Sequence, residues 1–510
     1  MLARVRSAAV LGLQAYAVDV EVDVASGLPG FAIVGLPDAA VQEAKERVRA
    51  AIRNTHYELP PRKITINLAP ADVRKAGPAF DLAMAVGILA ATGQIRPRRL
   101  DGVMLLGELS LDGGLRAVTG ALAVTMAARD RGGAIIVPEG NASEAALVEG
   151  VAVYPATSLA QVVEHLEGRA LITPFRASPA PGPAPEAGEH DFSEVRGQHH
   201  ARRAMEIAAA GGHNVLLIGP PGSGKTMLAR CLPTILPPLT WSEAIEVTRI
   251  YSVAGLLPAG NGPVRVRPFR SPHHTTSTAA MVGGGAGVRP GEITLAHRGV
   301  LFLDELPEFH RDVLEVLRQP LEDRVVTVAR AHLTVTFPAA FMLVGAMNPC
   351  PCGHRGEEGA ECLCTPPQVA RYLGRLSGPL LDRIDLHVEV PRLPPADLTA
   401  AAGGESSAAV LARVCAARDR QAGRFAGGVT CNALMSRKHL RRHCRLGDAE
   451  QTFVRAASER LGLSARGYDR LLRVARTIAD LDGSEAITRA HLAEAFQYRA
   501  LDRLRWLPGG

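Results

Sequence analysis

The stretch that decides the fold is "HNVLLIGPPGSGKTMLAR", residues 213–230. Its apolar residues from Val215 to Ile218 predict a buried strand, and the residues after Lys225 have a helical pattern. Between them, "GPPGSGKT" fits the phosphate-loop motif, in which a glycine-rich turn and a helix N-terminus direct backbone N–H groups at phosphates. A strand before and a helix after are the context that this motif requires, so an ordinary glycine-rich turn is the weaker alternative.

The loop predicts a site for ATP and magnesium. Lys225 is expected to reach the β- and γ-phosphates, and Thr226 is expected to offer its hydroxyl to Mg²⁺. The predicted nucleotide-binding residues are Gly219, Pro220, Pro221, Gly222, Ser223, Gly224, Lys225 and Thr226.

Two more apolar segments end in polar side chains. The run "GVLFLDELPEF" (299–309) predicts a strand followed by Asp304, a second magnesium ligand, and Glu305, the base that deprotonates the attacking water. The alternative, that acids here only cap a helix, suits Glu308 better than this pair. The strand in "FMLVGAMNP" ends at Asn348, which is expected to hold the same water. Because parallel strands present their carboxyl ends at one edge, we expect the three strand ends to meet at the γ-phosphate.

Half of the eight cysteines follow Asn348 directly, in "NPCPCGHRGEEGAECLC". Two C-x-C pairs separated by nine residues suit one tetrahedral, structural Zn²⁺, because four thiolates leave no open position. The alternative is that these are reduced cysteines that only pack. The four candidate zinc ligands are Cys350, Cys352, Cys362 and Cys364.

The composition is that of a globular protein with several domains. The 510 residues are 47% hydrophobic, and the longest apolar run is too short to span a bilayer, so no membrane segment is expected. The N-terminus resembles a signal peptide, but it continues into the alternating pattern "AVDVEVDVASG", which predicts a strand and a cytoplasmic location. Residues 411–510 hold nineteen Lys and Arg against ten Asp and Glu. This excess suits either a polyanion-binding surface or solvated, arginine-rich helices.

A linker rich in Pro, Ala and Gly, residues 173–190, divides the chain. Strands alternate with helical segments on both sides of it, which predicts an α/β fold with two α/β units, residues 1–172 and 191–392. Residues 393–510 have only helical periodicity and are expected to form a helical domain.

The phosphate loop, "LFLDELPEF", "AMNPCPCG", "PFRSPHHTTSTAAMVGGG" and "LSGPLLDRIDLHVEV" together resemble magnesium-chelatase-like AAA+ ATPases of the YifB and ComM type. The resemblance covers nearly the whole chain. It implies that Arg383 is an arginine finger for the neighbouring subunit's nucleotide and that the chain forms a hexameric ring. A salt bridge from Arg383 to Asp382 or Asp385 is the alternative. The segment "SARGYDRLLRVARTIADL" resembles the second sensor helix of the lid, which implies Arg466 as the sensor, with its neighbours Arg470 and Arg473 as alternatives.

The 78 positions between Thr226 and Asp304 exceed what a strand–helix–strand unit needs. The family places an insertion there, in the second helix and facing the pore, and a second hairpin is expected at 324–339, where Val and Thr alternate. The histidines of the insertion also suit metal ligands or ordinary loop residues. The candidate DNA contacts in these two segments are Arg270, His273, His274 and Arg330.

The N-terminal unit resembles the proteolytic domain of Lon proteases, which works through a Ser–Lys dyad. Ala79 stands at the place of the serine and Leu122 at the place of the lysine. Neither side chain can attack a carbonyl or accept its proton, so the resemblance implies a Lon-like domain without peptidase activity.

Two classes of function follow from these resemblances. The favoured one is an ATP-hydrolysing, hexameric motor that acts on DNA in branch migration or helicase-like unwinding. The alternative is an ATP-driven protein remodeller or a magnesium-chelatase-type chaperone.

Overall fold

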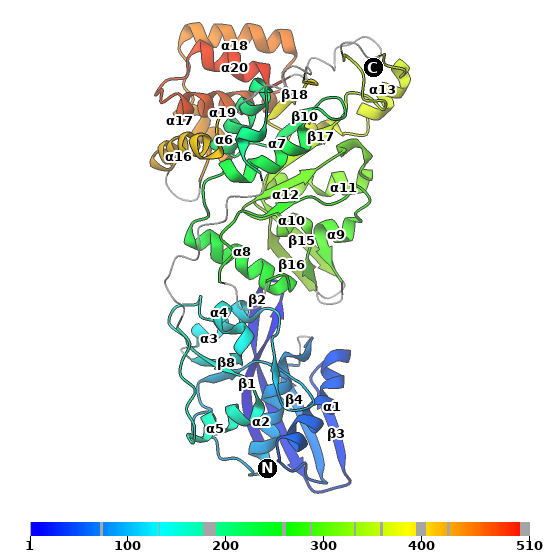
Figure 1. Cartoon of the computed structure of the whole chain (residues 1–510), viewed down its shortest axis with the longest axis vertical. Coiled ribbons are helices and arrows are strands. Elements are labelled where there is room, and N and C mark those ends of the chain that lie inside the picture. The colour runs from blue at the N-terminus through cyan, green and yellow to red at the C-terminus, as the bar shows by residue number, and fades with distance from the viewer. Residues whose placement is uncertain are drawn as a thin grey trace.

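The computed structural model describes residues 2–71, 75–131, 133–176, 190–257, 262–285, 288–330, 333–357, 361–393, 404–425 and 429–499. Three bodies follow one another along the long axis of the molecule, with the N-terminal unit at one end and the C-terminal helices at the other (Figure 1). The α/β class and the helical C-terminal region predicted from the sequence are confirmed. Most of the predicted linker, residues 177–189, lies outside the described part of the chain.

The N-terminal unit is a seven-stranded mixed sheet in the order β3-β4-β2-β1-β5-β8-β9. Its two longest strands, β1 and β2, pair antiparallel along their whole length and contain the alternating valines. The strands are β1 (Leu2–Leu11), β2 (Gln14–Ala25), β3 (Gly30–Val34), β4 (Lys63–Ala69), β5 (Val103–Leu105), β8 (Ala134–Pro138) and β9 (Ala152–Ala156), with a small ribbon of β6 (Glu108–Leu109) and β7 (Leu115–Arg116).

Helices cover this sheet, and the apolar helix α2 is buried almost completely against β1 and β2. The helices are α1 (Ala39–Asn54), α2 (Asp81–Ala91), α3 (Ala121–Arg129), α4 (Ala142–Ala145) and α5 (Leu159–Glu167). Leu122 is fully buried in α3 beside Leu147 and Val148, and Ala79 packs against a second apolar cluster. Both positions of the Lon-like dyad are therefore occupied by packed apolar side chains.

The central unit is built on a five-stranded sheet in the order β11-β14-β17-β10-β18, in which every pair is parallel. β10, which precedes the phosphate loop, lies between β17 and β18, and the four residues of β10 are all buried. The strands are β10 (Val215–Ile218), β11 (Phe269–Arg270), β14 (Val300–Leu303), β17 (Met342–Met347) and β18 (Leu386–Glu389).

Two ribbons project from this unit. β12 (Gly283–Gly284) and β13 (Arg289–Pro290) lie between two short helices that connect β11 to β14, where an insertion was predicted. β15 (Val325–Arg330) and β16 (Leu333–Pro338) form the ribbon predicted from alternating Val and Thr. The helices of the unit are α6 (His199–Gly211), α7 (Lys225–Cys231), α8 (Trp241–Ala254), α9 (Thr278–Val282), α10 (Glu292–Leu295), α11 (Arg311–Val316), α12 (Arg318–Asp323), α13 (Pro366–Leu373) and α14 (Gly378–Leu381).

The C-terminal region is a helical lid that shares one apolar core with the ATPase sheet. Residues of β10, α6 and the lid helices belong to the same buried cluster, and His213, just before β10, contacts the hydroxyl of Thr477 in the lid at 2.8 Å. The described lid helices are α16 (Ser407–Arg424), α17 (Arg437–His443), α18 (Asp448–Leu461), α19 (Ala465–Leu481) and α20 (Arg489–Gln497).

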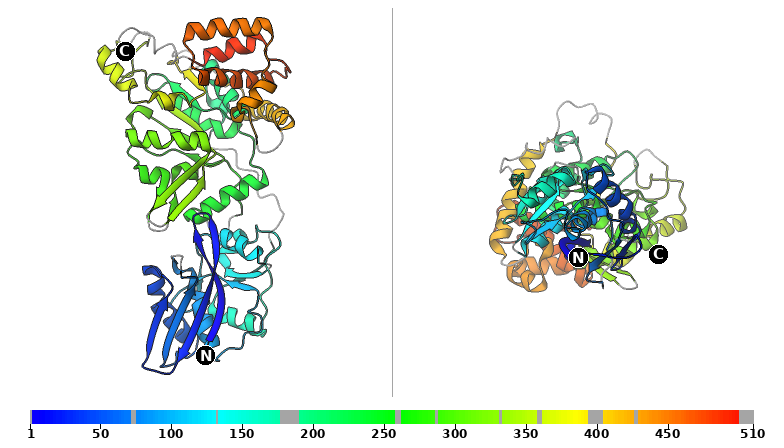
Figure 2. Two further views of the ribbon diagram at one scale, coloured as in Figure 1. Left: turned by 180° about the vertical axis from the view of Figure 1, so that it is seen from behind. Right: turned by 90° about the horizontal axis from the view of Figure 1, so that it is seen from below.

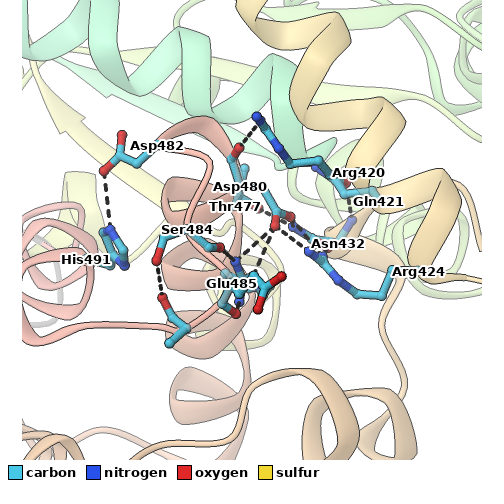
Figure 3. A network of polar contacts seen from close by, with 12 residues as sticks. Arg420, Gln421, Arg424, Asn432, Thr477, Asp480, Asp482, Ser484, Glu485 and His491 are labelled. Carbon is cyan, nitrogen blue, oxygen red and sulfur yellow. Dashed lines mark hydrogen bonds and ion pairs between the residues drawn. The ribbon is translucent and has the colours of Figure 1, made fainter.

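A buried carboxylate fixes these helices to one another (Figure 3). Asp480 is fully buried in α19 and accepts hydrogen bonds from Arg424 of α16, from Asn432 and from Arg476. Arg420 donates to the backbone oxygen of Asp480 at 2.7 Å. Since a buried charge is tolerated only when paired and hydrogen-bonded, this network holds the lid in one arrangement.

The N-terminal unit meets the ATPase unit at α8 and at the β15–β16 ribbon, as the view from behind also shows (Figure 2). The buried carboxylate of Glu144 accepts a hydrogen bond from the hydroxyl of Ser252 in α8. The β1–β2 turn reaches β16, where a Cβ on Gly12 would lie 2.4 Å from Val335. Gly12 also has φ +60°, so both its backbone and this contact require glycine.

None of the helices in the described ranges is both long enough and apolar enough to cross a membrane.

Candidate nucleotide site and arginine cavity

The phosphate loop has the backbone that its glycines allow. Gly222 and Gly224 have φ of +76° and +90°, in the left-handed region that other residues rarely adopt. A Cβ on Gly219 would lie 2.0 Å from the backbone oxygen of Val390, so the loop also needs glycine for close approach to the strand end of β18. The loop ends where α7 begins at Lys225, which directs free N–H groups of the helix N-terminus at the site.

Lys225 and Asn348 meet inside the loop. The Lys225 Nζ donates to the backbone oxygens of Gly219 and Pro220 at 2.7 Å each and lies 3.3 Å from the Asn348 Oδ1. Burial lowers the pKa of Lys225, and the nearby charge of Asp304 opposes this shift. Lys225 as a whole residue is only 8% exposed. Its ammonium is hydrogen-bonded to backbone oxygens, which the phosphate oxygens of a bound nucleotide would replace.

The predicted magnesium ligands lie side by side. Thr226 Oγ1 donates to Asp304 Oδ2 at 2.9 Å, which joins the start of α7 to the end of β14. Mg²⁺ prefers hydroxyl and carboxylate oxygens, together with water and phosphate. This pair therefore fits the cation that an ATPase of this type requires.

Glu305 leaves the end of β14 in an unusual conformation. Its φ is +49°, which is rare for a residue with a side chain and is found most often at functional sites. Its carboxylate lies 3.4 Å from the Nδ1 of His274, whose ring contacts that of His273 at 4.1 Å between centroids. The segment after β11 therefore reaches the residue that was predicted to be the base.

The four cysteines after β17 come together. The Sγ of Cys350 lies 3.4 Å from that of Cys352 and 3.7 Å from that of Cys362, and all four sulfurs lie within 4.8 Å of one another. Four thiolates about 2.3 Å from one Zn²⁺ would be about 3.8 Å apart, so the cluster fits a tetrahedral zinc site. In the same loop, a Cβ on Gly353 would lie 2.6 Å from Pro221, so the cysteine loop packs directly on the phosphate loop.

The predicted arginine finger and lid sensor lie together in a different place. Arg383 and Arg466 line one cavity of about 570 Å³, along with Arg470 and Arg473 of the same lid helix. Arg383 donates to Glu322 and to the backbone oxygen of Pro379. Asp385 lies instead near His213 and Arg470.

This cavity holds buried cationic groups that are only partly satisfied. Nitrogen atoms of Arg383, Arg470 and Arg473 are buried without a hydrogen-bond partner among the described residues. Burial alone would raise the pKa of Asp385, but a hydrogen bond from His213 and the charge of Arg470 hold it below its usual range. Asp385 is not itself on the cavity wall. Three acids, Glu322, Asp382 and Asp469, line the cavity together with six arginines, so positive charge is in excess and the cavity suits an anion.

The predicted DNA contacts are not gathered into one surface. Arg270 forms a bidentate ion pair with Glu292, with both distances 2.7 Å, and is therefore engaged within its own unit. The exposed His273 contacts Thr275. Arg330 ends β15, and its side chain lies outside what the structure describes.

Three contacts of the site could not be predicted from the motifs. Glu322 holds Arg383, His274 holds Glu305, and the phenol of Tyr372 interacts with the backbone of Asn348. Each of these residues lies in a loop or on a helix distant in sequence from its partner. The pair His273–His274 was noted in the sequence, but two adjacent histidines do not reveal which residue they contact in the fold.

A parallel sheet of this strand order, with a phosphate loop after β10 and an acidic pair after β14, defines a P-loop ATPase of the AAA+ class. The chain belongs to the family of magnesium chelatase subunit ChlI. Three models of this family match it: subunit ChlI of Mg-chelatase at residues 20–141, magnesium chelatase subunit ChlI at residues 191–398, and the C-terminal part of that subunit at residues 404–499. Membership in this family of AAA+ ATPases implies ATP hydrolysis.

Relatives of two kinds resemble the chain. The uncharacterized protein YifB of Escherichia coli is 48% identical and the competence protein ComM of Haemophilus influenzae is 46% identical, each over 99% of this chain and 98% of the relative. The magnesium-chelatase 38 kDa subunit of Cereibacter sphaeroides is 27% identical over 62% of this chain and 92% of that subunit. The chain is thus an ATPase of the YifB and ComM type.

Proposed function

We propose that the chain is the subunit of a hexameric, ATP-driven motor that acts on DNA, in branch migration or helicase-like unwinding. The observation that carries this proposal is the separation of two half-sites. Lys225, Thr226, Asp304 and Asn348 converge at the strand ends, while Arg383 lies in another cavity with the lid arginines.

The first half-site accounts for binding and attack. Lys225 and the loop N–H groups hold the phosphates, and Mg²⁺ on Thr226 and Asp304 supplies charge neutralisation. Glu305 accepts the proton of the attacking water, and Asn348, at the end of the neighbouring strand, holds that water in place.

The second half-site supplies positive charge from outside. Hydrolysis develops charge on the γ-phosphate, and an added arginine is worth about 10³–10⁵ in rate for enzymes of this type. We place Arg383 and Arg466 against the nucleotide of the neighbouring subunit, because they share a cavity in which buried guanidinium nitrogens lack hydrogen-bond partners among the described residues. This arrangement closes only in a ring.

The choice of DNA as substrate rests on the resemblance and on charge. The full-length similarity is to YifB and to a relative named a competence protein, whereas the chelatase subunit matches less of this chain. The excess of basic residues in 411–510 also favours a polyanion.

Two substitutions test the catalytic assignment. Lys225→Ala should abolish ATP binding, because the phosphates lose their buried cation. Glu305→Gln should bind ATP normally and slow hydrolysis by about 10²-fold or more, because only the base is lost. Nucleotide binding by fluorescence and turnover by phosphate release measure both effects. Unchanged turnover in Glu305→Gln would show that another group is the base.

The substrate is tested by ATP turnover with single-stranded, duplex and branched DNA. We expect stimulation by DNA, greatest with branched substrates, in wild-type protein and none in Glu305→Gln. An assembled ring that hydrolyses ATP but neither binds DNA at low salt nor responds to it would favour the protein remodeller or chelatase-type chaperone.

A further inference from the structure

The lid contains a second basic cavity beside the one around Arg383, and Arg437 and Asp469 line both. It measures about 790 Å³ and lies between α17, α18 and the start of α19. The side chains used in this argument are Arg437, Arg441, Arg445, Arg455, Tyr468 and Asp469, and we call the cavity the lid groove.

The sequence concentrates positive charge on one wall of the lid groove. Residues 437–445 hold five Lys and Arg and no Asp or Glu. Arg437 and Arg441 lie one turn apart on α17, and Arg445 follows two residues after the helix ends at His443. Like charges at this spacing repel one another. The favourable position of cations near a helix C-terminus offsets this only in part.

Some other arginines of the lid are neutralised by carboxylates. Arg424 and Arg476 share Asp480 in the buried network of Figure 3. Arg413 pairs with Glu206 and Glu405. These side chains are therefore committed to holding the fold.

The arginines of the lid groove differ from these. Arg437 pairs with Asp469 at 3.1 Å, but Arg441, Arg445 and Arg455 are exposed and form no ion pair with any residue in the described ranges. Glu459 is the other acid on the wall. Three guanidinium groups thus remain available, one on α17, one just after it and one on α18.

We propose that the lid groove binds the phosphate backbone of DNA. A single small anion needs donors that converge on one point, whereas Arg437 and Arg441 lie about 6 Å apart along α17, Arg445 follows the end of that helix, and Arg455 of α18 lines the same groove. Such an arrangement suits a chain of phosphates. Tyr468, 37% exposed on the same wall, offers a ring on which an unpaired base can stack. This inference rests on the proposed function and adds a contact outside the pore.

The test compares two double variants of the full chain. Arg441→Ala with Arg455→Ala removes two groove arginines. Arg442→Ala with Arg460→Ala removes the same charge from the same two helices, at exposed positions that do not line the groove. Binding of labelled single-stranded and duplex DNA is measured by anisotropy across a salt series, together with ATP turnover without DNA.

We expect the groove variant to bind both DNAs more weakly and to lower the slope of log affinity against log salt by about 1.4 for single strands and 1.8 for duplex. The control variant should lose much less, and ATP turnover without DNA should stay at the wild-type rate in both.

Three results would overturn the inference. If wild-type protein binds DNA and the groove variant shows the same salt slope, the lid groove does not bind DNA, and the proposed function is unaffected. Equal losses of DNA affinity in the groove and control variants would mean that only the net charge of the lid matters for binding. Loss of ring assembly in the groove variant, measured by mass photometry with ATP, would make the groove a subunit contact. Failure of wild-type protein to bind any DNA would instead refute the proposed function.

Discussion

Glu305 must point its carboxylate at the nucleotide, yet 57% of its side chain is exposed and long exposed side chains rotate freely. His274 restricts that rotation from 3.4 Å away. His274 follows β11 in the segment that also leads to the β12–β13 ribbon. A displacement of that ribbon would therefore change the orientation of the base without moving the phosphate loop.

We predict that His274→Ala slows ATP hydrolysis by up to about fivefold, because exposed ion pairs contribute up to about 1 kcal/mol. Nucleotide affinity should stay unchanged, since His274 contacts neither the loop nor Lys225. His274→Asn, which retains a hydrogen-bond donor, should recover part of the rate. His273→Ala is the neighbouring control. A parallel loss of nucleotide affinity would mean that His274 supports the fold of the site instead.

The sequence predicted that Lys225, Thr226, Asp304 and Asn348 would meet. Asp304 and Asn348 each follow a strand, the loop that leads to Lys225 and Thr226 follows a third, and parallel strands end at one edge. It did not predict that His274 would reach Glu305. Strand ends are placed by sheet register, whereas a loop residue is placed by packing with distant segments. The hydrophobic pattern contains no information on such packing.

At the scale of elements, the cysteine loop connects two strand ends. It begins after β17, brings four thiols together and packs Gly353 on Pro221 of the phosphate loop. A metal ion bound by the four thiols would fix the position of Asn348 relative to the phosphate loop. The sequence predicted the cluster but not the contact with Pro221, which depends on how the loop folds back.

We predict about one zinc per chain in protein purified with reduced thiols. Cys362→Ser with Cys364→Ser should remove the metal and lower both the unfolding temperature and the affinity for ATP. Cys415→Ser, a thiol of α16 outside the cluster, is the control. Elemental analysis and thermal unfolding give the readouts. Wild-type protein without zinc would leave the four cysteines as packing residues.

At the scale of the whole molecule, Glu144 connects the N-terminal unit to α8. Burial raises the pKa of this carboxyl, and hydrogen bonds from Ser252 and from the Leu122 N–H oppose the shift. A raised pKa in the folded chain means that protonation stabilises the fold. This contribution is present at low pH and is lost as pH rises through the raised pKa.

We therefore predict that Glu144→Gln gains stability relative to wild type as pH rises from about 4.5 toward neutrality, because the amide has no charge to bury. Thermal unfolding of both proteins across this range measures the difference. Glu149→Gln, an exposed acid of the same unit, should show no such trend. Parallel pH profiles of Glu144→Gln and wild type would show that Glu144 keeps its ordinary pKa.

The ring itself is tested by mixing inactive subunits. Arg383→Ala retains the base and Glu305→Gln retains the finger, so an interface with one of each can form a complete site. Equal mixing should restore hydrolysis at about a quarter of the interfaces of a head-to-tail ring. Mixing Arg383→Ala with the double variant Arg383→Ala/Glu305→Gln should restore none. Equal turnover in both mixtures, with co-assembly shown, would place the action of Arg383 within its own subunit.

The β1–β2 turn gives the N-terminal unit a mechanical connection to the motor. β1 and β2 are ten and twelve residues long, so the pair is a stiff rod of about 33–40 Å. Its tip contacts Val335 at Gly12, where no larger residue fits. Any stroke of the β15–β16 ribbon must slide past this tip or tilt the rod. The N-terminal sheet is therefore an elastic load on any movement of the ribbon, and its stiffness opposes that movement.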